Sequence, residues 1–126
     1  MTIDSKNLVV EFYEKYNNRD VEGAMAYIGE TYIQHNPWVA DGPDAFRRFV
    51  TFLRDNFPDG RNEVKRVIAD GDLVALHVHS VRVPGEEGRA IVDIFRTENG
   101  KIVEHWDVVQ PIPREIYPPI NDNGYF

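Results

Sequence analysis

Ionisable side chains that could exchange protons with a substrate gather in the last third of the sequence. The clearest stretch is KIVEHWDVVQ, residues 101–110, which has the pattern of a β-strand yet carries Glu104, His105 and Asp107 around Trp106. Imidazole and carboxylate groups are the usual proton carriers of general acid–base catalysis. Whether these groups can act in that way depends on which of them point into the interior of the protein.

Side-chain alternation decides which candidate groups share a face, because successive residues of a β-strand point to opposite sides. The sets that contain candidate groups are, in order along the chain, His77 with His79, Asp93 with Ile91 and Phe95, and His105 with Asp107. Both sets of every strand are largely apolar. This pattern predicts a sheet that is covered on both faces.

The turn ENG, residues 98–100, controls how two of these strands pair. In a three-residue loop Asp93 would face His105, whereas in a two-residue Asn-Gly turn Asp93 would face Trp106. Both turns accept Asn-Gly, so the sequence leaves the two registers open. With the first register, and with a symmetric loop that sets His79 opposite Asp93, one face carries His77, His79, Asp93, His105 and Asp107.

Three imidazoles and two carboxylates on an apolar face could perform acid–base chemistry, since burial disfavours the charged carboxylate and a nearby imidazole can hold a proton. The alternative is a polar patch of the core in which each group satisfies a neighbour. A metal site is not predicted, because no two of these residues have the spacing of a helical metal site. No cofactor is predicted either.

A second candidate group lies in the segment YIQHNP, before Pro37. His35 and Asn36 could contribute polar atoms to a pocket, or they could simply cap the loop. Trp38 then belongs either to the core or to the wall of the pocket.

Composition limits the class of protein. The chain has 126 residues, no cysteine and a formal net charge of -7, which favours one domain, excludes disulfides and argues against a nucleic-acid partner. The N-terminal residues are too charged for a signal peptide, and no apolar run is long enough to cross a membrane. A cytoplasmic location is the default expectation.

The elements that must position these groups follow an α+β order. Apolar residues recur at helical spacing within about residues 4–57, with Asp20 as the cap of a short second helix and Pro43 in the first turn of a third. A brief extended piece precedes Pro37. Four strands with a period of two occupy about residues 61–110. The proline-rich tail, residues 111–126, is expected to dock through Tyr117, Ile120, Tyr125 and Phe126.

The motifs YIQHNP, DGDLVALHVHS, AIVDIFRTENGKIVEHWDVVQPIP and NDNGYF resemble the SnoaL-like branch of the nuclear transport factor 2-like superfamily, in particular the bacterial group of predicted aldol-condensation enzymes. The resemblance spans nearly the whole chain as a single domain, residues 1–126. It implies a cone-shaped, curved mixed sheet wrapped around three helices, an apolar pocket, and a homodimer through the outer face of the sheet.

The resemblance also implies roles. In polyketide cyclases of this branch an aspartate on the last strand is the acid/base, and the matching position here is Asp107. A histidine on the preceding strand is replaced here by Asp93. The family pattern favours the three-residue turn, which places Asp107 in the pocket and Glu104 and Trp106 on the outer face.

The expected function is cofactor-independent acid–base chemistry on a small carbonyl compound, of the aldol, cyclase or isomerase type. Catalytic roles are assigned to Asp107, His35, Asp93 and His105, and substrate contacts to Asn36, Trp38, His77, His79, Ile91 and Phe95. Two alternatives remain. One is epoxide hydrolysis or dehydration, for which Arg89 could reach the inward face at a strand end whereas Arg96 has the wrong parity. The other is a module that binds a small ligand or a second subunit without catalysis.

Overall fold

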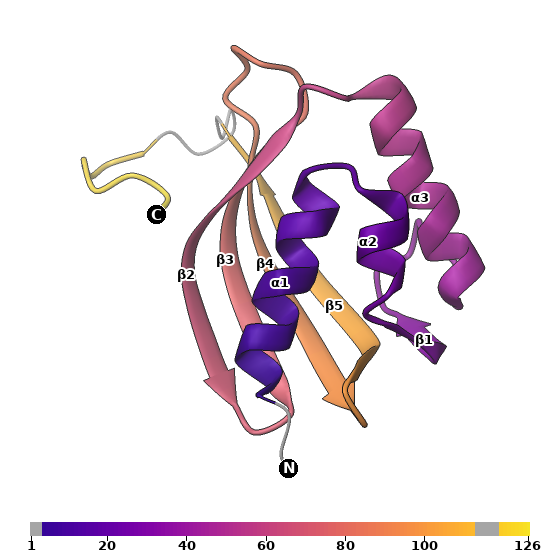
Figure 1. Cartoon of the computed structure of the whole chain (residues 1–126). Helices are drawn as coiled ribbons and strands as arrows, with labels where there is room; N and C mark the ends of the chain where they lie inside the picture. Colours follow the sequence, from indigo (N-terminus) through magenta and orange to yellow (C-terminus); the bar gives the residue numbers. More distant parts are fainter. Residues whose placement is uncertain (1–3, 113–118) are drawn as a thin grey trace.

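The computed structural model describes residues 4–112 and 119–126 (Figure 1). Its helices are α1 (Ser5–Asn17), α2 (Val21–Met25) and α3 (Pro43–Asn56). Its strands are β1 (Ile28–Gln34), β2 (Arg61–Asp70), β3 (Leu73–Val81), β4 (Arg89–Glu98) and β5 (Lys101–Pro111). The expected α+β class with three helices before the main sheet is confirmed.

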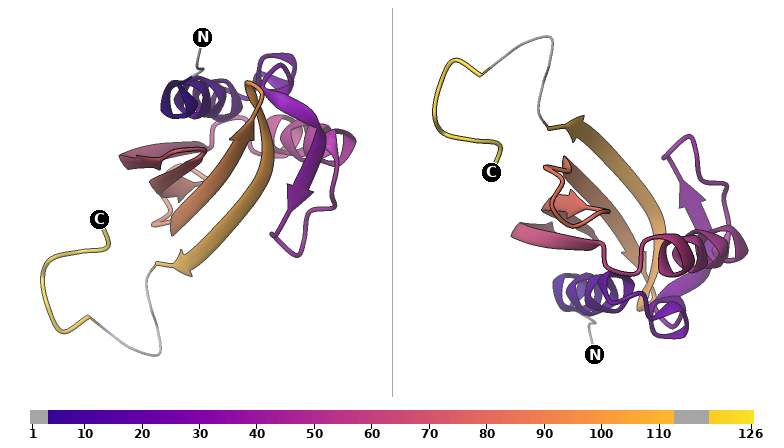
Figure 2. Two further views of the ribbon diagram at one scale, coloured as in Figure 1. Left: turned by 90° about the horizontal axis from the view of Figure 1, so that it is seen from below. Right: turned by 90° about the horizontal axis from the view of Figure 1, so that it is seen from above.

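The strands form one open, mixed sheet in the order β1-β5-β4-β3-β2. β2 to β5 are antiparallel neighbours, whereas β1 pairs with β5 in parallel. The sheet is curved, with the helices on one side and the C-terminal segment on the other (Figure 2). The extended piece predicted before Pro37 is β1, which begins at Ile28.

Capping residues fix where the first two helices begin. The carboxylate of Asp4 accepts hydrogen bonds from the backbone N–H groups of Lys6 and Asn7, and that of Asp20 accepts one from Gly23 at 2.9 Å. α3 instead begins with Pro43, whose missing N–H costs nothing in a first turn. These local signals explain why the helices were predictable.

An aromatic and aliphatic core fills the space between the helices and the sheet. Phe12 of α1 is 1% exposed and lies beside Phe46 of α3 and Phe95 of β4, with ring centroids 5.6 and 5.5 Å away. Val74, Leu76 and Val78 of β3 are completely buried against this layer. The inner face of the sheet is therefore the one that carries the even-numbered residues of β3.

The turn between β4 and β5 is the two-residue one, so the expectation of a three-residue loop was wrong. Glu98 pairs with Lys101, and Asn99 and Gly100 both have positive φ, as a type I′ turn requires. A β-bulge then places Val103 as an extra residue, so that Asp93 lies opposite Asp107. The bulge restores the parity that the tight turn alone would have reversed.

The hairpin between β3 and β4 is asymmetric, and it moves two histidines out of the predicted cluster. His79 pairs with Ala90 and His77 with Val92, whereas Asp93 pairs with Leu76. The more apolar set of β3 faces the helices because that arrangement removes more apolar surface from water. His77 and His79 consequently lie on the outer face, and their placement in the pocket was wrong.

Part of the C-terminal segment lies against this outer face. The Phe126 ring centroid is 5.3 Å from that of His77 and 4.9 Å from that of His79. Ile120 is completely exposed, and Tyr117 lies outside the described residues. Docking of the tail is thus seen for its last residue. Within residues 4–112 and 119–126 no helix is both long and apolar enough to span a membrane.

Candidate active site

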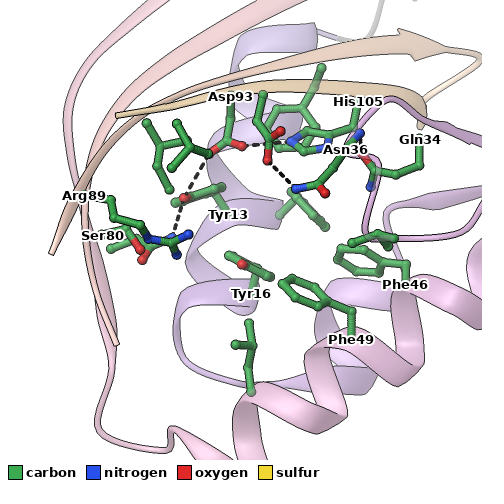
Figure 3. Close-up of a pocket in the computed structure, with 18 of the residues that line it drawn as sticks. Tyr13, Tyr16, Gln34, Asn36, Phe46, Phe49, Ser80, Arg89, Asp93 and His105 are labelled. Atoms are coloured by element: carbon green, nitrogen blue, oxygen red, sulfur yellow. Dashed lines mark hydrogen bonds and ion pairs between the residues drawn. The ribbon is translucent and has the colours of Figure 1, made fainter. Parts of the chain in front are cut away.

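A cavity of about 90 Å³ opens between the inner face of the sheet and helices α1 and α3 (Figure 3). By the same measure a water molecule needs about 10–15 Å³, so the cavity has room for several waters or a small organic molecule. Its side chains come from every strand and from two of the helices. The residues that line it include Tyr13, Tyr16, Asn36, Asp93, His105 and Asp107.

Asp93 and His105 form a buried pair at the sheet side of the cavity. His105 Nε2 is 2.8 Å from Asp93 Oδ1, and the two residues are 8% and 7% exposed. They meet because they lie on the inner faces of neighbouring strands, where Phe95 pairs with His105 and Asp93 with Asp107. A buried pair in this geometry exchanges one proton between nitrogen and oxygen without large movement.

Gln34 fixes the orientation of the imidazole. Its Oε1 accepts a hydrogen bond from the backbone N–H of Asn36 at 3.1 Å and lies 2.7 Å from His105 Nδ1. Because Oε1 can only accept, Nδ1 must carry a proton and donate it. A second proton is therefore shared between His105 Nε2 and Asp93 Oδ1, so the pair consists of imidazolium and carboxylate or of imidazole and carboxylic acid.

Asp107 lies beside this pair and is the more accessible carboxylate. Its Oδ2 accepts a hydrogen bond from Asn36 Nδ2 at 3.0 Å. One side-chain oxygen or nitrogen from each of Asp93, His105 and Asp107 lies within 4.8 Å of the others. Asp107 is only partly buried, whereas Asp93 and His105 are buried, so Asp107 is more accessible to a molecule in the cavity.

Two tyrosines of α1 complete the polar wall. Tyr13 Oη accepts a hydrogen bond from Asn62 Nδ2 at 2.7 Å and donates to Asp93 Oδ2 at 3.3 Å. Burial, reinforced by the negative charge of Asp93, raises the pKa of Tyr13 well above its usual value and that of Tyr16 to about 12. Both phenols therefore remain protonated near neutral pH and can donate hydrogen bonds.

Three arginines line the cavity away from the carboxylates: Arg19, Arg82 and Arg89. Burial lowers the pKa of Arg89, and the positive charge of Arg82 lowers it further, while Asp107 and Asp93 act in the opposite direction. The pKa of Arg19 is also lowered, mainly by burial. The cavity thus has an acidic side and a basic side.

The structure brings together six of the ten residues predicted for the site. The cavity is lined by Asn36, Ile91, Asp93, Phe95, His105 and Asp107. Their individual roles stay predictions.

The other four predicted residues lie elsewhere: His35, Trp38, His77 and His79. His35 is on the outer face, where its ring stacks on Trp106 at 4.9 Å and its Nε2 lies 2.7 Å from Glu104 Oε2. Adjacent residues of an extended segment point to opposite sides, so His35 and Asn36 could not both enter the cavity. Trp38 is 88% exposed and forms no part of the core or the cavity wall.

Sequence reasoning missed several lining residues. Gln34 could have been found from parity, because Tyr32, Gln34 and Asn36 alternate along the same extended segment. The remaining missed residues that contribute polar groups are Tyr13, Tyr16, Arg19, Tyr32, Asn62, Ser80 and Arg82. They come from distant parts of the chain, and only the tertiary fold brings them to one cavity.

A divalent metal ion could in principle bind to Asp93, His105 and Asp107, whose potential ligand atoms are close enough. The existing contacts favour protons instead. Asp93 Oδ1 already meets His105 Nε2 at 2.8 Å, and a metal on that nitrogen would replace the shared proton.

Comparisons with known proteins agree with this fold. Residues 9–105 match the model of the SnoaL-like domain. Among curated proteins none matches the chain.

Several solved structures share the fold. An NTF2-like protein of unknown function from Cytophaga hutchinsonii has a TM-score of 0.74 at 18% identity, covering 90% of this chain and 96% of its own. A proposed ketosteroid isomerase from Kribbella flavida has a TM-score of 0.73 at 22% identity, covering 93% and 83%. A proposed polyketide cyclase from Acidithiobacillus ferrooxidans has a TM-score of 0.68 at 20% identity, covering 86% and 91%. With the family model matching most of its length, the chain belongs to the SnoaL-like domain family, within the NTF2-like fold.

Proposed function

We propose that the protein is a cofactor-independent acid–base enzyme that enolises a small carbonyl compound in this cavity. The observation that carries the proposal is the grouping of Asp107 with the proton-sharing Asp93–His105 pair, within 4.8 Å, on the wall of a cavity. Similarity of fold to a proposed ketosteroid isomerase and a proposed polyketide cyclase, both named for chemistry at an enolisable carbonyl, supports this reaction class.

Asp107 is the general base in this proposal. Its Oδ2 is held by Asn36 Nδ2, and this hydrogen bond fixes the carboxylate while its other oxygen is left for a substrate C–H group. The carboxylate would take a proton from the carbon next to the carbonyl, and the electron pair of that C–H bond would move onto the carbonyl oxygen. A positioned base of this kind typically accelerates proton transfer by about 10²–10⁴.

Tyr16 is the proposed donor to the resulting enolate oxygen. It lines the cavity, and a pKa of about 12 keeps its phenol protonated at neutral pH. A hydrogen bond that strengthens as negative charge develops lowers the barrier to enolisation. In an isomerisation, the proton taken by Asp107 would return to a different carbon. In an aldol reaction, the enolate carbon would attack a second carbonyl carbon, and the proton held by Asp107 would pass to the alkoxide oxygen formed there.

The Asp93–His105 pair acts behind Asp107 as a proton reservoir. His105 Nδ1 donates its proton to a hydrogen bond with Gln34, so His105 exchanges a proton with Asp93 through Nε2. His35, His77 and His79 have no part in this proposal because they lie on the outer face.

Epoxide hydrolysis by an Asp-Arg-Asp relay is less well supported. Arg89 does line the cavity, whereas Arg96 lies on the outer face in contact with Glu104. However, within the described part of the chain no arginine nitrogen lies within 4.0 Å of an oxygen of Asp93 or Asp107, as such a relay would need.

The proposal is tested by incubating the protein with a panel of ketones, aldehydes and epoxides in D₂O. We expect deuterium to replace hydrogen next to the carbonyl of one or more ketones or aldehydes, detected by mass spectrometry. The epoxides serve as the test of the hydrolytic alternative.

Two variants serve in this experiment. Asp107→Asn should abolish the exchange, and Glu104→Gln, on the same strand but on the outer face, should leave it unchanged. Diol formation without any exchange would overturn enolisation in favour of hydrolysis. Tight binding with neither reaction would favour a binding module.

A further inference from the structure

The three arginines that line the cavity come from separate parts of the chain, and all three lie near Tyr16, where their positive charges lower its pKa. Arg19 follows α1, Arg82 follows β3 and Arg89 begins β4. Figure 3 shows Arg89 and Ser80 together at one side of the cavity, apart from Asp93 and His105. Ser80 pairs with Arg89 across the strands and is 4% exposed, so this end is also lined by a buried hydroxyl group.

Within the described residues, none of these three arginines forms an ion pair with a carboxylate, although Asp107 and Asp93 act on Arg89 from a greater distance. Throughout residues 4–112 and 119–126, no Asp or Glu oxygen lies within 4.0 Å of a side-chain nitrogen of Arg19, Arg82 or Arg89. Arg82 instead stacks over the Phe57 ring, 5.4 Å from its centroid, and Arg19 Nε donates to the Phe57 carbonyl oxygen at 3.2 Å. Gathering guanidinium groups around one cavity is unfavourable unless an anion binds between them.

The backbone of Arg19 gives independent support. Arg19 has a φ of 61° and is 8% exposed, directly after α1. Its N–H donates to the Tyr16 carbonyl and the N–H of Asp20 to that of Lys15, which is the left-handed helix end where glycine is usual. A non-glycine residue there costs free energy. The strained backbone conformation of Arg19 places its side chain at the cavity.

The distance between the two ends suits a short substrate. Arg89 and Asp93 are four residues apart on β4, which is about 13 Å between their Cα atoms. An arginine side chain that extends along the cavity toward the carboxylates would shorten this gap. A molecule whose acid group lies two to three carbons from its reactive carbon could therefore reach from one end to the other.

We infer that Arg19, Arg82 and Arg89 form a carboxylate-binding subsite and that the substrate is a small oxo acid. The identification of the ligand as a substrate rests on the proposed enolisation, whereas the subsite itself does not. Guanidinium groups bind a carboxylate through paired N–H donors. The bound acid would direct the carbon next to its carbonyl, and not its negative charge, toward Asp107.

Direct binding tests this inference without any need for turnover. Acetoacetate, 4-oxopentanoate and 5-oxohexanoate are titrated against their methyl esters by calorimetry or by NMR shift mapping. At least one acid should bind more tightly than its ester by about tenfold or more, the effect of a charge-assisted hydrogen bond. Added NaCl should weaken the binding of the acid more than that of the ester.

Substitutions of the arginines test whether these residues cause the tighter binding of the acid. Arg89→Gln and Arg82→Gln should each reduce the preference for the acid, and Arg89→Lys should retain part of it. Arg96→Gln, on the same strand but facing outward, should leave the preference intact. Arg19 is left unchanged because of its role at the end of α1.

Two results would overturn the inference. Equal binding of acids and esters by the wild-type protein would show that no carboxylate subsite exists. Stronger competition by inorganic phosphate than by acetate would assign the subsite to phosphoryl groups instead. If acids bind through the arginines but no ligand exchanges its proton in D₂O, the subsite stands and the proposed enolisation fails.

Discussion

At the scale of single residues, hydrogen-bond partners separate the two carboxylates of the site. Asp93 is enclosed by His105 and Tyr13, whereas among the described residues Asp107 is hydrogen-bonded to Asn36 alone and lines the cavity. The same residue type therefore serves two purposes. The enclosed carboxylate maintains a proton network, and the open one is available to a substrate.

Because the pKa values of Tyr13 and Tyr16 are raised in the folded protein, we expect the protein to lose stability at high pH. The pKa of Tyr16 is raised to about 12 in the folded protein, above the usual value of 10.0. A group with a raised folded-state pKa contributes stability below its unfolded pKa and loses it as pH rises through the folded one. The free energy of unfolding should thus fall between about pH 10 and 12, by up to about 3 kcal/mol from Tyr16.

Urea unfolding at a series of pH values checks this expectation. Tyr16→Phe removes the ionisable group while keeping the ring, so its stability should fall less steeply over the same range. If the free energy of unfolding falls equally with pH in both proteins, ionisation of Tyr16 does not destabilise the fold.

The residues of the site were only partly predictable from the sequence. Asp107, Asp93 and His105 could be assigned to one face because all three lie on adjacent strands with a short turn between them. Arg89 could be placed at the inward face from its position at a strand end, and it does line the cavity. Tyr16 could not be assigned, since no local pattern says what the face of a helix will contact. Adjacent His35 and Asn36 were taken as a pair although strand alternation separates them.

At the scale of elements, two irregularities of the sheet position the site. The bulge at Val103 returns Asp107 to the inner face after a two-residue turn, and the asymmetric hairpin turns His77 outward. The sequence cannot place a bulge, because any residue of a strand can be the extra one. It also does not fix a hairpin register when the loop between the strands is long.

The stability of the β3–β4 hairpin should depend on the absence of a Cβ atom at Gly88. A Cβ atom on Gly88 would collide with the Ser80 carbonyl oxygen, and its φ is 77°. Gly85 in the same loop has a φ of 95° but nothing within 4 Å of such an atom. Gly88→Ala should therefore destabilise the protein by more than the roughly 1–2 kcal/mol of left-handed strain expected for Gly85→Ala.

Urea denaturation of both variants measures the difference. Because Gly88 precedes Arg89, the Gly88→Ala variant should also bind oxo acids more weakly than the Gly85→Ala variant does. Equal losses of stability would mean that the close approach to Ser80 has no energetic consequence.

At the scale of the whole molecule, the outer face of the sheet exposes several apolar side chains among its polar ones. One cross-strand row contains Ile68, Ala75, Ile94 and Trp106, and Ile68 is 64% exposed. Val108, on the neighbouring row, is 67% exposed. We propose that two chains associate through this face, which would remove these side chains from water.

Light scattering after size-exclusion chromatography tests the association. The wild-type protein should have twice the chain mass of 14.6 kDa. Val108→Asp should shift it toward the monomer, whereas Val10→Asp, which introduces the same charge on the exposed side of α1, should not. A monomeric wild-type protein would contradict the proposal.

The fold could be predicted from the sequence more completely than the site could. Helix caps, apolar periodicity and Asn-Gly or Gly-rich turns are local signals, and they agree with each other along the chain. The pairing of β1 with β5 required the tertiary structure, because a parallel partner is distant in sequence and leaves no local mark. That pairing is what brings Gln34 and Asn36 to His105 and Asp107.

The central claim is that Asp107 removes a proton from a bound carbonyl compound. The most direct measurement is the rate of deuterium incorporation, followed by NMR in D₂O at saturating substrate, for the wild-type protein and Asp107→Asn, with the dissociation constant measured in parallel. The account predicts that the rate falls by about 10²–10⁴ while the dissociation constant changes little. A rate for Asp107→Asn equal to that of the wild-type protein would contradict it.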